Sequence, residues 1–163
     1  MSHNAFGPDG VSAYVEFLEK CPSLKVLDVT NCGLGPQGSE MIAEAILKNE
    51  EMKLEEFSAS RDRLENPGIE ALSKVFSAHG TLKKIEVYQN GIRKGLSHLF
   101  TALLDCADTI EYVDVQDNLI KRATGEMVEF VKTCQKVKYF NISDTLIKKN
   151  QQKEVVDAIV ESI

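Results

Sequence analysis

The stretch Leu24-Lys25-Val26-Leu27-Asp28-Val29-Thr30-Asn31-Cys32-Gly33-Leu34 decides the fold of this chain. Its apolar residues follow the pattern LxxLxVxxCxL. Leu27 and Val29 alternate with polar residues, and this period of two predicts a short strand with one apolar face. Gly33 follows closely, so we expect the chain to turn where the strand ends.

The same pattern recurs along the whole chain. Four further copies start at Leu54, Leu82, Ile110 and Val137, and a truncated copy opens the chain at Asn4-x-Phe6. One column of the repeat steps by 28, 30, 28, 28 and 27 residues, and its members are Asn4, Cys32, Asp62, Asn90, Asn118 and Thr145. An Asn here can bond backbone groups as the chain leaves the strand, whereas a Cys or Thr can do less of this. The pattern is similar to the template of the leucine-rich repeats, in the long form that carries a full helix.

A helix is predicted after each turn. Pro8, Pro36 and Pro67 suit a first helical turn, where the missing N–H is not needed. Apolar residues at spacings of three and four then predict helices over 11–20, 40–47, 69–76, 96–104, 125–131 and 153–163. One strand–helix unit cannot close a core alone, so neighbouring units must stack. We therefore expect an α/β leucine-rich-repeat solenoid, a right-handed horseshoe with short parallel strands on the concave face and helices on the convex face.

Residues 1–163 are expected to form a single leucine-rich-repeat domain of about six repeats, with no linker or second domain. The chain begins after the point where its first strand should start, and it ends directly after a helix without a polar capping unit. We therefore expect the domain to be truncated at one or both ends.

Composition excludes several classes of protein. The chain has 163 residues, 43% of them hydrophobic, and a net charge of −6. Such an acidic balance argues against nucleic acid as a partner, and no apolar run reaches the roughly 20 residues that cross a membrane. The four cysteines are widely spaced and form no CxxC pair, so we interpret them as buried, reduced thiols and predict no metal site.

No self-contained active site is predicted. His3, His79 and His98 pair with no Ser or Cys at a predictable site. The glycine-rich stretches at 7–10 and 33–38 precede helices, but they lack the lysine and the spacing of phosphate-binding loops. The turns of the repeat explain these glycines.

Polar columns on the concave face and its edge are the candidate binding residues. Three columns should face solvent between the core positions: Val26, Glu56, Lys84, Tyr112 and Tyr139; Asp28, Ser58, Glu86, Asp114 and Asn141; Thr30, Ser60, Tyr88, Gln116 and Ser143. They suit either plain solvation of a solenoid or binding of a basic patch. A fourth column, the rim, lies where each strand ends: His3, Asn31, Arg61, Gln89, Asp117 and Asp144. Rigidly stacked turns would hold these side chains at fixed separations, which suits protein recognition.

A family resemblance rests on these same segments. The stretches 2–8, 31–37 (Asn-Cys-Gly-Leu-Gly-Pro-Gln), 61–66 (Arg-Asp-Arg-Leu-Glu-Asn), 89–93 and 113–118 resemble successive repeats of the Ran GTPase-activating proteins. The Arg-x-Arg-Leu-Glu-Asn segment, one repeat after Asn-x-Gly-Leu-Gly-Pro, is the most specific of them. Two positions depart from the family pattern, because Asp62 and Cys32 stand where asparagine is usual.

The resemblance implies a protein that docks on GTP-bound Ran and accelerates GTP hydrolysis without an arginine finger. Asn31 would help to place Ran's own catalytic glutamine against the attacking water, because an amide both donates and accepts. Partner-binding roles are implied for Arg61, Arg63, Gln89 and Asp117. GTP and Mg²⁺ belong to the partner GTPase, so the chain itself should need no cofactor.

The resemblance also implies a place in the cytoplasm, including the cytoplasmic face of the nuclear envelope. A Ran-binding protein is a further candidate in the same complex. The alternative is a non-catalytic leucine-rich-repeat interaction module, of the ribonuclease-inhibitor or actin-filament-capping kind. Only Asn31 and the segment 61–66 distinguish the two.

Overall fold

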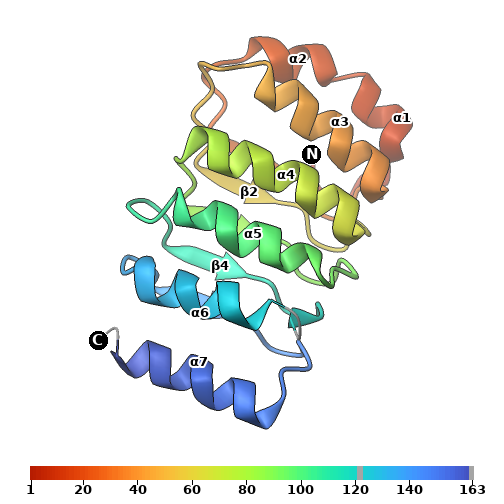
Figure 1. Cartoon of the computed structure of the whole chain (residues 1–163). Coiled ribbons are helices and arrows are strands. Elements are labelled where there is room, and N and C mark those ends of the chain that lie inside the picture. Colours follow the sequence, from red (N-terminus) through yellow and green to blue (C-terminus); the bar gives the residue numbers. More distant parts are fainter. Residues whose placement is uncertain (121–122, 162–163) are drawn as a thin grey trace.

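In the computed structural model, which describes residues 1–120 and 123–161, helices and strands alternate along the chain (Figure 1). The strands are β1 (Val26–Asp28), β2 (Glu56–Ser58), β3 (Lys84–Glu86), β4 (Tyr112–Asp114) and β5 (Tyr139–Asn141). The helices are α1 (Gly7–Ser12), α2 (Val15–Lys20), α3 (Gly35–Leu47), α4 (Glu65–His79), α5 (Gly95–Leu104), α6 (Thr124–Thr133) and α7 (Lys149–Glu161). No helix in these ranges is both long and apolar enough to cross a membrane.

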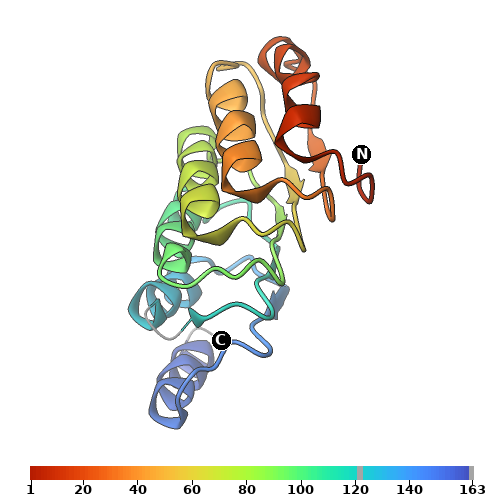
Figure 2. The same ribbon diagram turned by 90° about the vertical axis from the view of Figure 1, so that its right-hand side faces the viewer.

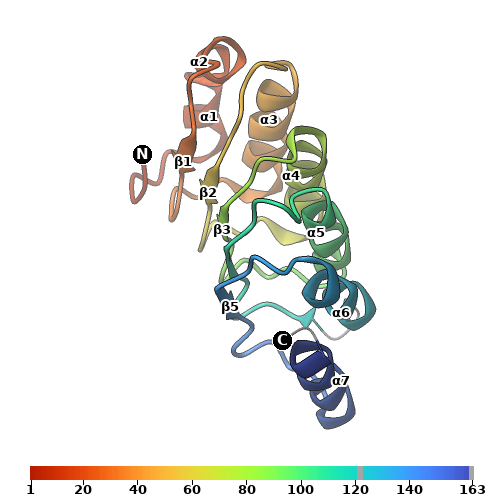
Figure 3. The ribbon, with the colours of Figure 1, turned by 90° about the vertical axis from the view of Figure 1, so that its left-hand side faces the viewer.

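The five strands form one parallel sheet in the order β1-β2-β3-β4-β5. Leu27 pairs with Phe57, Phe57 with Ile85, and Ile85 with Val113, so each strand lies in register one full repeat from the next. Figures 2 and 3 show the consequence, two curved layers with strands on one side and helices on the other. The predicted α/β repeat solenoid is confirmed.

Apolar residues of the repeat fill the space between the two layers. Leu27, Phe57, Ile85 and Val113 point inward from the strands and are at most 3% exposed. Burying each such side chain stabilises the fold by about 1.5–3 kcal/mol. Because neighbouring repeats supply each other's packing partners, the core runs through the stack as one cluster.

The helices begin earlier than the apolar periodicity predicts. Helix α3 begins at Gly35 rather than 40, and α4 at Glu65 rather than 69. The first turns are polar or glycine-rich and so carry no apolar signal, yet Gly38 and Gly68 are buried there, packed close to Val11 and Ser39 of the preceding repeat. Residues 162–163, at the end of the last predicted helix, lie outside the described residues.

The prediction of one helix over 11–20 is wrong. The segment contains the end of α1 and all of α2, with a break at Ala13 and Tyr14. The N–H groups of these two residues donate to Gly10 and Val11, three residues back, which tightens and ends α1. At this break the Tyr14 ring packs edge-on against the Phe6 ring, with the ring centroids 5.4 Å apart.

Buried side chains at the turn column tie each repeat to its neighbour. The Asn90 Oδ1 atom accepts the backbone N–H groups of Asp62 (2.9 Å) and Leu64 (3.3 Å) in the preceding repeat. Its Nδ2 group donates to the carbonyls of Ala59 (2.8 Å) and Val87 (2.9 Å). Asn118 repeats this arrangement one step further along the stack. The predicted asparagine turn is thus also a bridge between repeats.

Asp62 fills the same column with a carboxyl group. Its Oδ1 atom accepts the N–H groups of Cys32 (2.7 Å), Gly33 (2.7 Å) and Leu34 (3.3 Å). Its Oδ2 atom is buried without a hydrogen-bond partner, because an ionised carboxylate cannot donate as the asparagine amide does. Burial raises the pKa of the Asp62 carboxyl above its ordinary value, even though the backbone N–H groups act in the opposite direction.

We predict that Asp62→Asn stabilises the protein at pH 7, by about 1–2 kcal/mol, because the amide replaces the unpaired carboxylate oxygen with an N–H donor, the group that Asn90 uses to bond carbonyls. The folded state holds the Asp62 proton more tightly than the unfolded chain does. The stabilisation that proton binding at Asp62 adds to the folded state is therefore complete below about pH 4, the pKa of this carboxyl in the unfolded chain. It is lost as the pH rises through the higher pKa of the folded state.

Urea unfolding of both proteins at pH 4.5 and pH 7 measures this effect, and the gain from Asp62→Asn should be larger at pH 7. As a matched control, Asn90→Asp introduces a second buried carboxyl and should lower the free energy of unfolding. An equal gain at both pH values would show that folding does not raise the pKa of the Asp62 carboxyl.

Candidate functional site

The rim column predicted from the sequence has an unusual backbone. All six of its residues are exposed and lie in the left-handed region, with φ values of 62° (His3), 56° (Asn31), 58° (Arg61), 55° (Gln89), 52° (Asp117) and 56° (Asp144). Non-glycine residues seldom adopt this region, although His, Asn and Asp do so more often than others. The residue types at His3, Asn31, Asp117 and Asp144 were therefore a sequence signal for a left-handed turn.

Backbone hydrogen bonds hold the rim in place. The N–H groups of Asn31, Arg61 and Gln89 donate to carbonyls of the next repeat, at Ser60 (2.8 Å), Tyr88 (3.0 Å) and Gln116 (2.9 Å). The bonds continue the parallel ladder past the ends of the strands. The rim side chains thus project from an ordered edge at one position per repeat.

Two side-chain contacts link neighbouring rim residues. The Asn31 amide nitrogen lies 3.2 Å from Nδ1 of His3, and the amide oxygen of Asn31 makes no hydrogen bond within the described part of the chain. The Arg61 Nε group donates to Gln89 Oε1 (2.9 Å), and its guanidinium lies 5.8 Å from the centre of the Tyr88 ring. Sequence analysis placed Tyr88 in a neighbouring column of candidate binding residues, but it did not predict this contact with Arg61.

A shallow groove of about 480 Å³ brings three predicted site residues together. Asn31, Arg61 and Arg63 line it, together with Ala5, Pro8, Gly33, Leu34, Gly35, Pro36 and Gln37. Gln89 lies beside the groove through its bond to Arg61, whereas Asp117 is one repeat further along the rim and does not line it. Four of the five predicted site residues therefore lie in or beside the groove, and Asp117 lies away from it.

Arg63 and Glu65 extend the left-handed backbone beyond the rim. Both have φ of 54°, and Gly33 and Gly35 stand at the matching positions of the preceding repeat with φ of 72° and 61°. An L residue in this region costs roughly 1–3 kcal/mol, and such strain collects at functional sites. Glycine would relieve this strain, but Ala5 and Leu146 adopt the same left-handed backbone at the matching positions of other repeats.

Burial removes three of the four cysteines from the candidate chemistry. Cys32, Cys106 and Cys134 are buried free thiols, and burial raises the pKa of the Cys134 thiol to about 12. Cys21, also expected to be buried, is half-buried instead, at the C-terminal end of α2. In residues 1–120 and 123–161, no three His, Cys, Asp or Glu side chains gather closely enough to hold a metal ion.

The repeats and the rim define a leucine-rich-repeat protein whose strand ends present an exposed, mostly polar edge. Residues 20–43 match the family model described as "Leucine Rich repeat". Among solved structures, the C-terminal domain of tropomodulin from Caenorhabditis elegans superimposes with a TM-score of 0.73 at 16% identity, over 93% of this chain and 92% of that one. That likeness shows the fold.

Sequence comparison then identifies the particular relatives. The chain is 39% identical over 102 residues to Ran GTPase-activating protein 1 of Xenopus laevis, covering 56% of this chain. It is 30% identical over 172 residues to Ran GTPase-activating protein 1 of Saccharomyces cerevisiae, covering 99% of this chain. The matches span 18% and 42% of those relatives' own lengths. The resemblance to the Ran GTPase-activating proteins is confirmed.

We predict that Arg63→Gly raises the free energy of unfolding by about 0.5–1 kcal/mol, since glycine adopts the left-handed backbone without strain. The matched control is Arg93→Gly, because Arg93 is an exposed arginine whose φ is not positive. There, glycine adds only chain entropy to the unfolded state and should destabilise. Urea unfolding compares the two, and a similar loss in both would mean that the backbone at Arg63 is unstrained.

Proposed function

We propose that this chain is an activator of GTP hydrolysis by the small GTPase Ran, acting on the partner's active site rather than through one of its own. The relatives' names support this proposal, and one structural observation carries it. Asn31 presents an uncommitted amide oxygen from a rigid left-handed turn, in the same groove as Arg61 and Arg63. The finer assignments below rest on that geometry.

Asn31 is the proposed catalytic residue. Its amide is suited to hold the side-chain amide of Ran's glutamine, because each amide has both a donor and an acceptor. Such a contact orients the glutamine and the attacking water, and orientation lowers the barrier without covalent chemistry. The GTP and its Mg²⁺ are held by Ran in its GTP form, and the chain supplies no cofactor.

Arg61 is proposed as a binding residue rather than an arginine finger. Its guanidinium is directed along the rim to Gln89 and lies by the Tyr88 ring, so it is held close to the protein surface. A cation fixed in this way attracts an acidic patch on the partner and gives register to docking. Arg63, Gln89 and Asp117 would extend the same contact surface.

The setting of the complex is part of the proposal. We place the chain in the cytoplasm, including the cytoplasmic face of the nuclear envelope, with a Ran-binding protein as a further component of the complex. The alternative, a non-catalytic interaction module, requires the same fold but not the groove residues. Single-turnover GTP hydrolysis by Ran, with and without the chain, decides between them.

For Asn31, the expected loss is in hydrolysis and not in docking. Asn31→Asp keeps the shape and tolerates the left-handed turn, but it puts a charged carboxylate where the neutral amide presents its uncommitted oxygen. It should lower stimulated single-turnover hydrolysis by about 100-fold, while the dissociation constant for Ran·GTP changes by no more than a few-fold. Asn31→Ala should show the same loss.

Asp144→Ala is the matched control, because Asp144 has the same exposed left-handed backbone far along the rim. It should leave hydrolysis unchanged. An Asn31→Asp protein as active as the unmutated one would reduce Asn31 to a turn residue. If the unmutated chain binds Ran·GTP without speeding hydrolysis, the interaction-module alternative is correct.

For Arg61, the expected loss is in binding. Arg61→Ala should weaken the affinity for Ran·GTP about fivefold at low salt and flatten the salt dependence of the association rate, since exposed charges are screened. Arg93→Ala removes an exposed charge outside the groove and serves as the control. Stopped-flow association at a series of salt concentrations tests this, and equal salt slopes for both variants would contradict the role of Arg61.

A further inference from the structure

The Asn31 side chain meets the ring of His3 across the boundary between two repeats. The Asn31 Nδ2 atom lies 3.2 Å from Nδ1 of His3. An amide nitrogen only donates, so the ring nitrogen must accept in this contact, and the neutral ring then carries its hydrogen on Nε2. This hydrogen bond uses the nitrogen end of the amide and leaves the Asn31 Oδ1 atom uncommitted within the described part of the chain.

The backbones that carry the two side chains are fixed at successive positions of the rim. Both are left-handed, with φ of 62° at His3 and 56° at Asn31. The His3 N–H group donates to the Thr30 carbonyl (2.8 Å), and further along the same turn the Gly7 N–H group donates to the Cys32 carbonyl (2.9 Å). Hydrogen bonds between the two repeats therefore bring the ring and the amide together.

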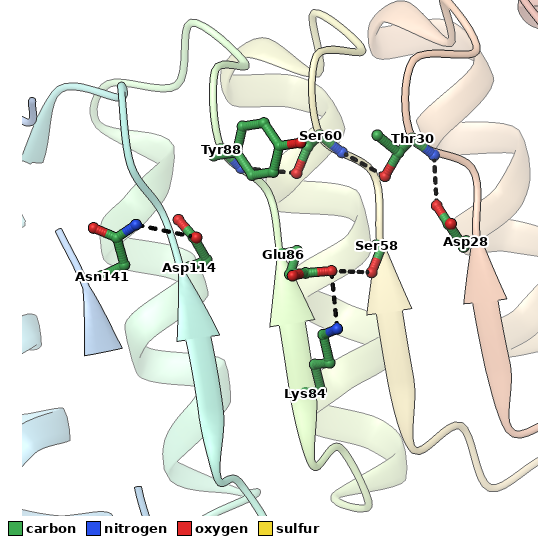
Figure 4. A network of polar contacts seen from close by, with 9 residues as sticks. All are labelled: Asp28, Thr30, Ser58, Ser60, Lys84, Glu86, Tyr88, Asp114 and Asn141. Carbon is green, nitrogen blue, oxygen red and sulfur yellow. Dashed lines mark hydrogen bonds and ion pairs between the residues drawn. The ribbon is translucent and has the colours of Figure 1, made fainter. Parts of the chain in front are cut away.

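The peptide that precedes Asn31 is bonded on the strand side as well. The Asp28 Oδ1 atom accepts the Thr30 N–H (2.9 Å), and the Thr30 hydroxyl oxygen accepts the Ser60 N–H (3.4 Å), as Figure 4 shows. Ser60 is fully buried, although its column was predicted to face solvent. Two other members of the predicted solvent-facing columns are buried too, Ser58 and Asp114. The freedom left to Asn31 is therefore mainly in its side-chain torsions.

The charged and titratable groups on the elements beside the His3 ring have partners of their own. The Asp28 carboxylate accepts a backbone N–H group, and the Met1 ammonium donates to the Asp28 carbonyl (3.1 Å). The Arg61 guanidinium, two rim positions away, bonds the next residue along the rim (2.9 Å). Burial raises the pKa of the Cys32 thiol, which therefore stays protonated. Within the described ranges, the Asn31 amide is thus the side chain that bonds the ring.

The direction of the Asn31 amide decides which of its two ends a partner meets. The terminal torsion of an asparagine is broad and roughly two-fold, so an unsupported amide turns over easily. One hydrogen bond favours one orientation by about twofold to tenfold. A neutral ring, which accepts at Nδ1, favours the nitrogen toward His3 and the oxygen outward. A protonated ring donates at Nδ1 and favours the reverse.

We propose that His3 is a positioning residue for Asn31. Its neutral ring holds the amide nitrogen, so that the amide oxygen faces the partner and accepts an N–H group of the glutamine side chain of Ran. Protonation of the ring draws the amide oxygen to His3 and presents the nitrogen instead. The inference rests on the proposed function of Asn31, and it adds a dependence on pH that an asparagine alone does not have.

Two replacements of His3 separate positioning from turn structure. His3→Asn keeps an acceptor oxygen near the place of Nδ1 and suits a left-handed backbone, whereas His3→Leu keeps the bulk without an acceptor. At pH 7.5, His3→Asn should retain the kcat of stimulated hydrolysis within about twofold. His3→Leu should lower kcat about threefold to tenfold, with the KM for Ran·GTP within about twofold. Thermal unfolding of both variants shows that the fold is retained.

The pH profile gives a readout that a turn residue would not move. Histidine ordinarily exchanges its proton between about pH 5 and 8. The ratio of stimulated to intrinsic hydrolysis should fall about tenfold from pH 7.5 to pH 5.5 for the unmutated chain, and it should stay level for His3→Asn. The intrinsic rate of Ran at each pH corrects for titration of the partner. His98→Gln is the matched control, because His98 is an exposed histidine of α5, and its profile should be that of the unmutated chain.

NMR of the free chain tests the contact without Ran. The side-chain NH₂ signals of Asn31 should shift between pH 7.5 and pH 5.5 in the unmutated chain and stay constant in His3→Asn. Signals that do not shift in the unmutated chain, a falling hydrolysis profile in His3→Asn, or full kcat in His3→Leu would each overturn the role of His3. Those outcomes leave Asn31 untouched, since Asn31→Asp tests it separately. If Asn31→Asp also hydrolyses at the unmutated rate, the proposed function of Asn31 fails first.

Discussion

The buried side chain at the end of each strand is the contact on which the other features depend. Each strand has only three residues, and the backbone bonds between repeats leave some N–H groups of the following turn, such as those of Asp62 and Leu64, to a side chain. Asn90 and Asn118 supply the missing bonds, because each amide accepts N–H groups from the preceding repeat and donates to its carbonyls. This bonding fixes the turn, and the residue just before each column member is held in the left-handed region as a result.

That constraint explains why the candidate site lies on the rim. A left-handed turn directs its side chain away from the core, and the interrepeat ladder repeats this direction once per repeat. The core and the rim therefore tolerate different changes. Core positions are fixed by packing, whereas Asn31 and Arg61 need only suit the turn and are free to serve recognition.

Asp62 shows how closely the core and the rim are coupled. Its buried carboxyl is a poorer turn residue than asparagine, yet it bonds three backbone N–H groups directly after Asn31. Arg61 and Arg63, on either side of it, both have left-handed backbones. Strain and an unsatisfied polar atom therefore coincide at the groove, where stability has been given up locally within a well-packed stack.

The sequence alone determined the repeat, the parallel sheet, the inward positions and the membership of the rim, because all of these follow from a period of two within a period of about 28 residues. Only the tertiary structure decided the break at Tyr14, the burial of Ser60 and the groove that joins Asn31 to Arg63. The physical reason is the range of the interactions. Periodicity reports which face a residue occupies within its own repeat, whereas burial, strain and side-chain contacts depend on the size and shape of residues about 28 positions away, in the repeats stacked on either side.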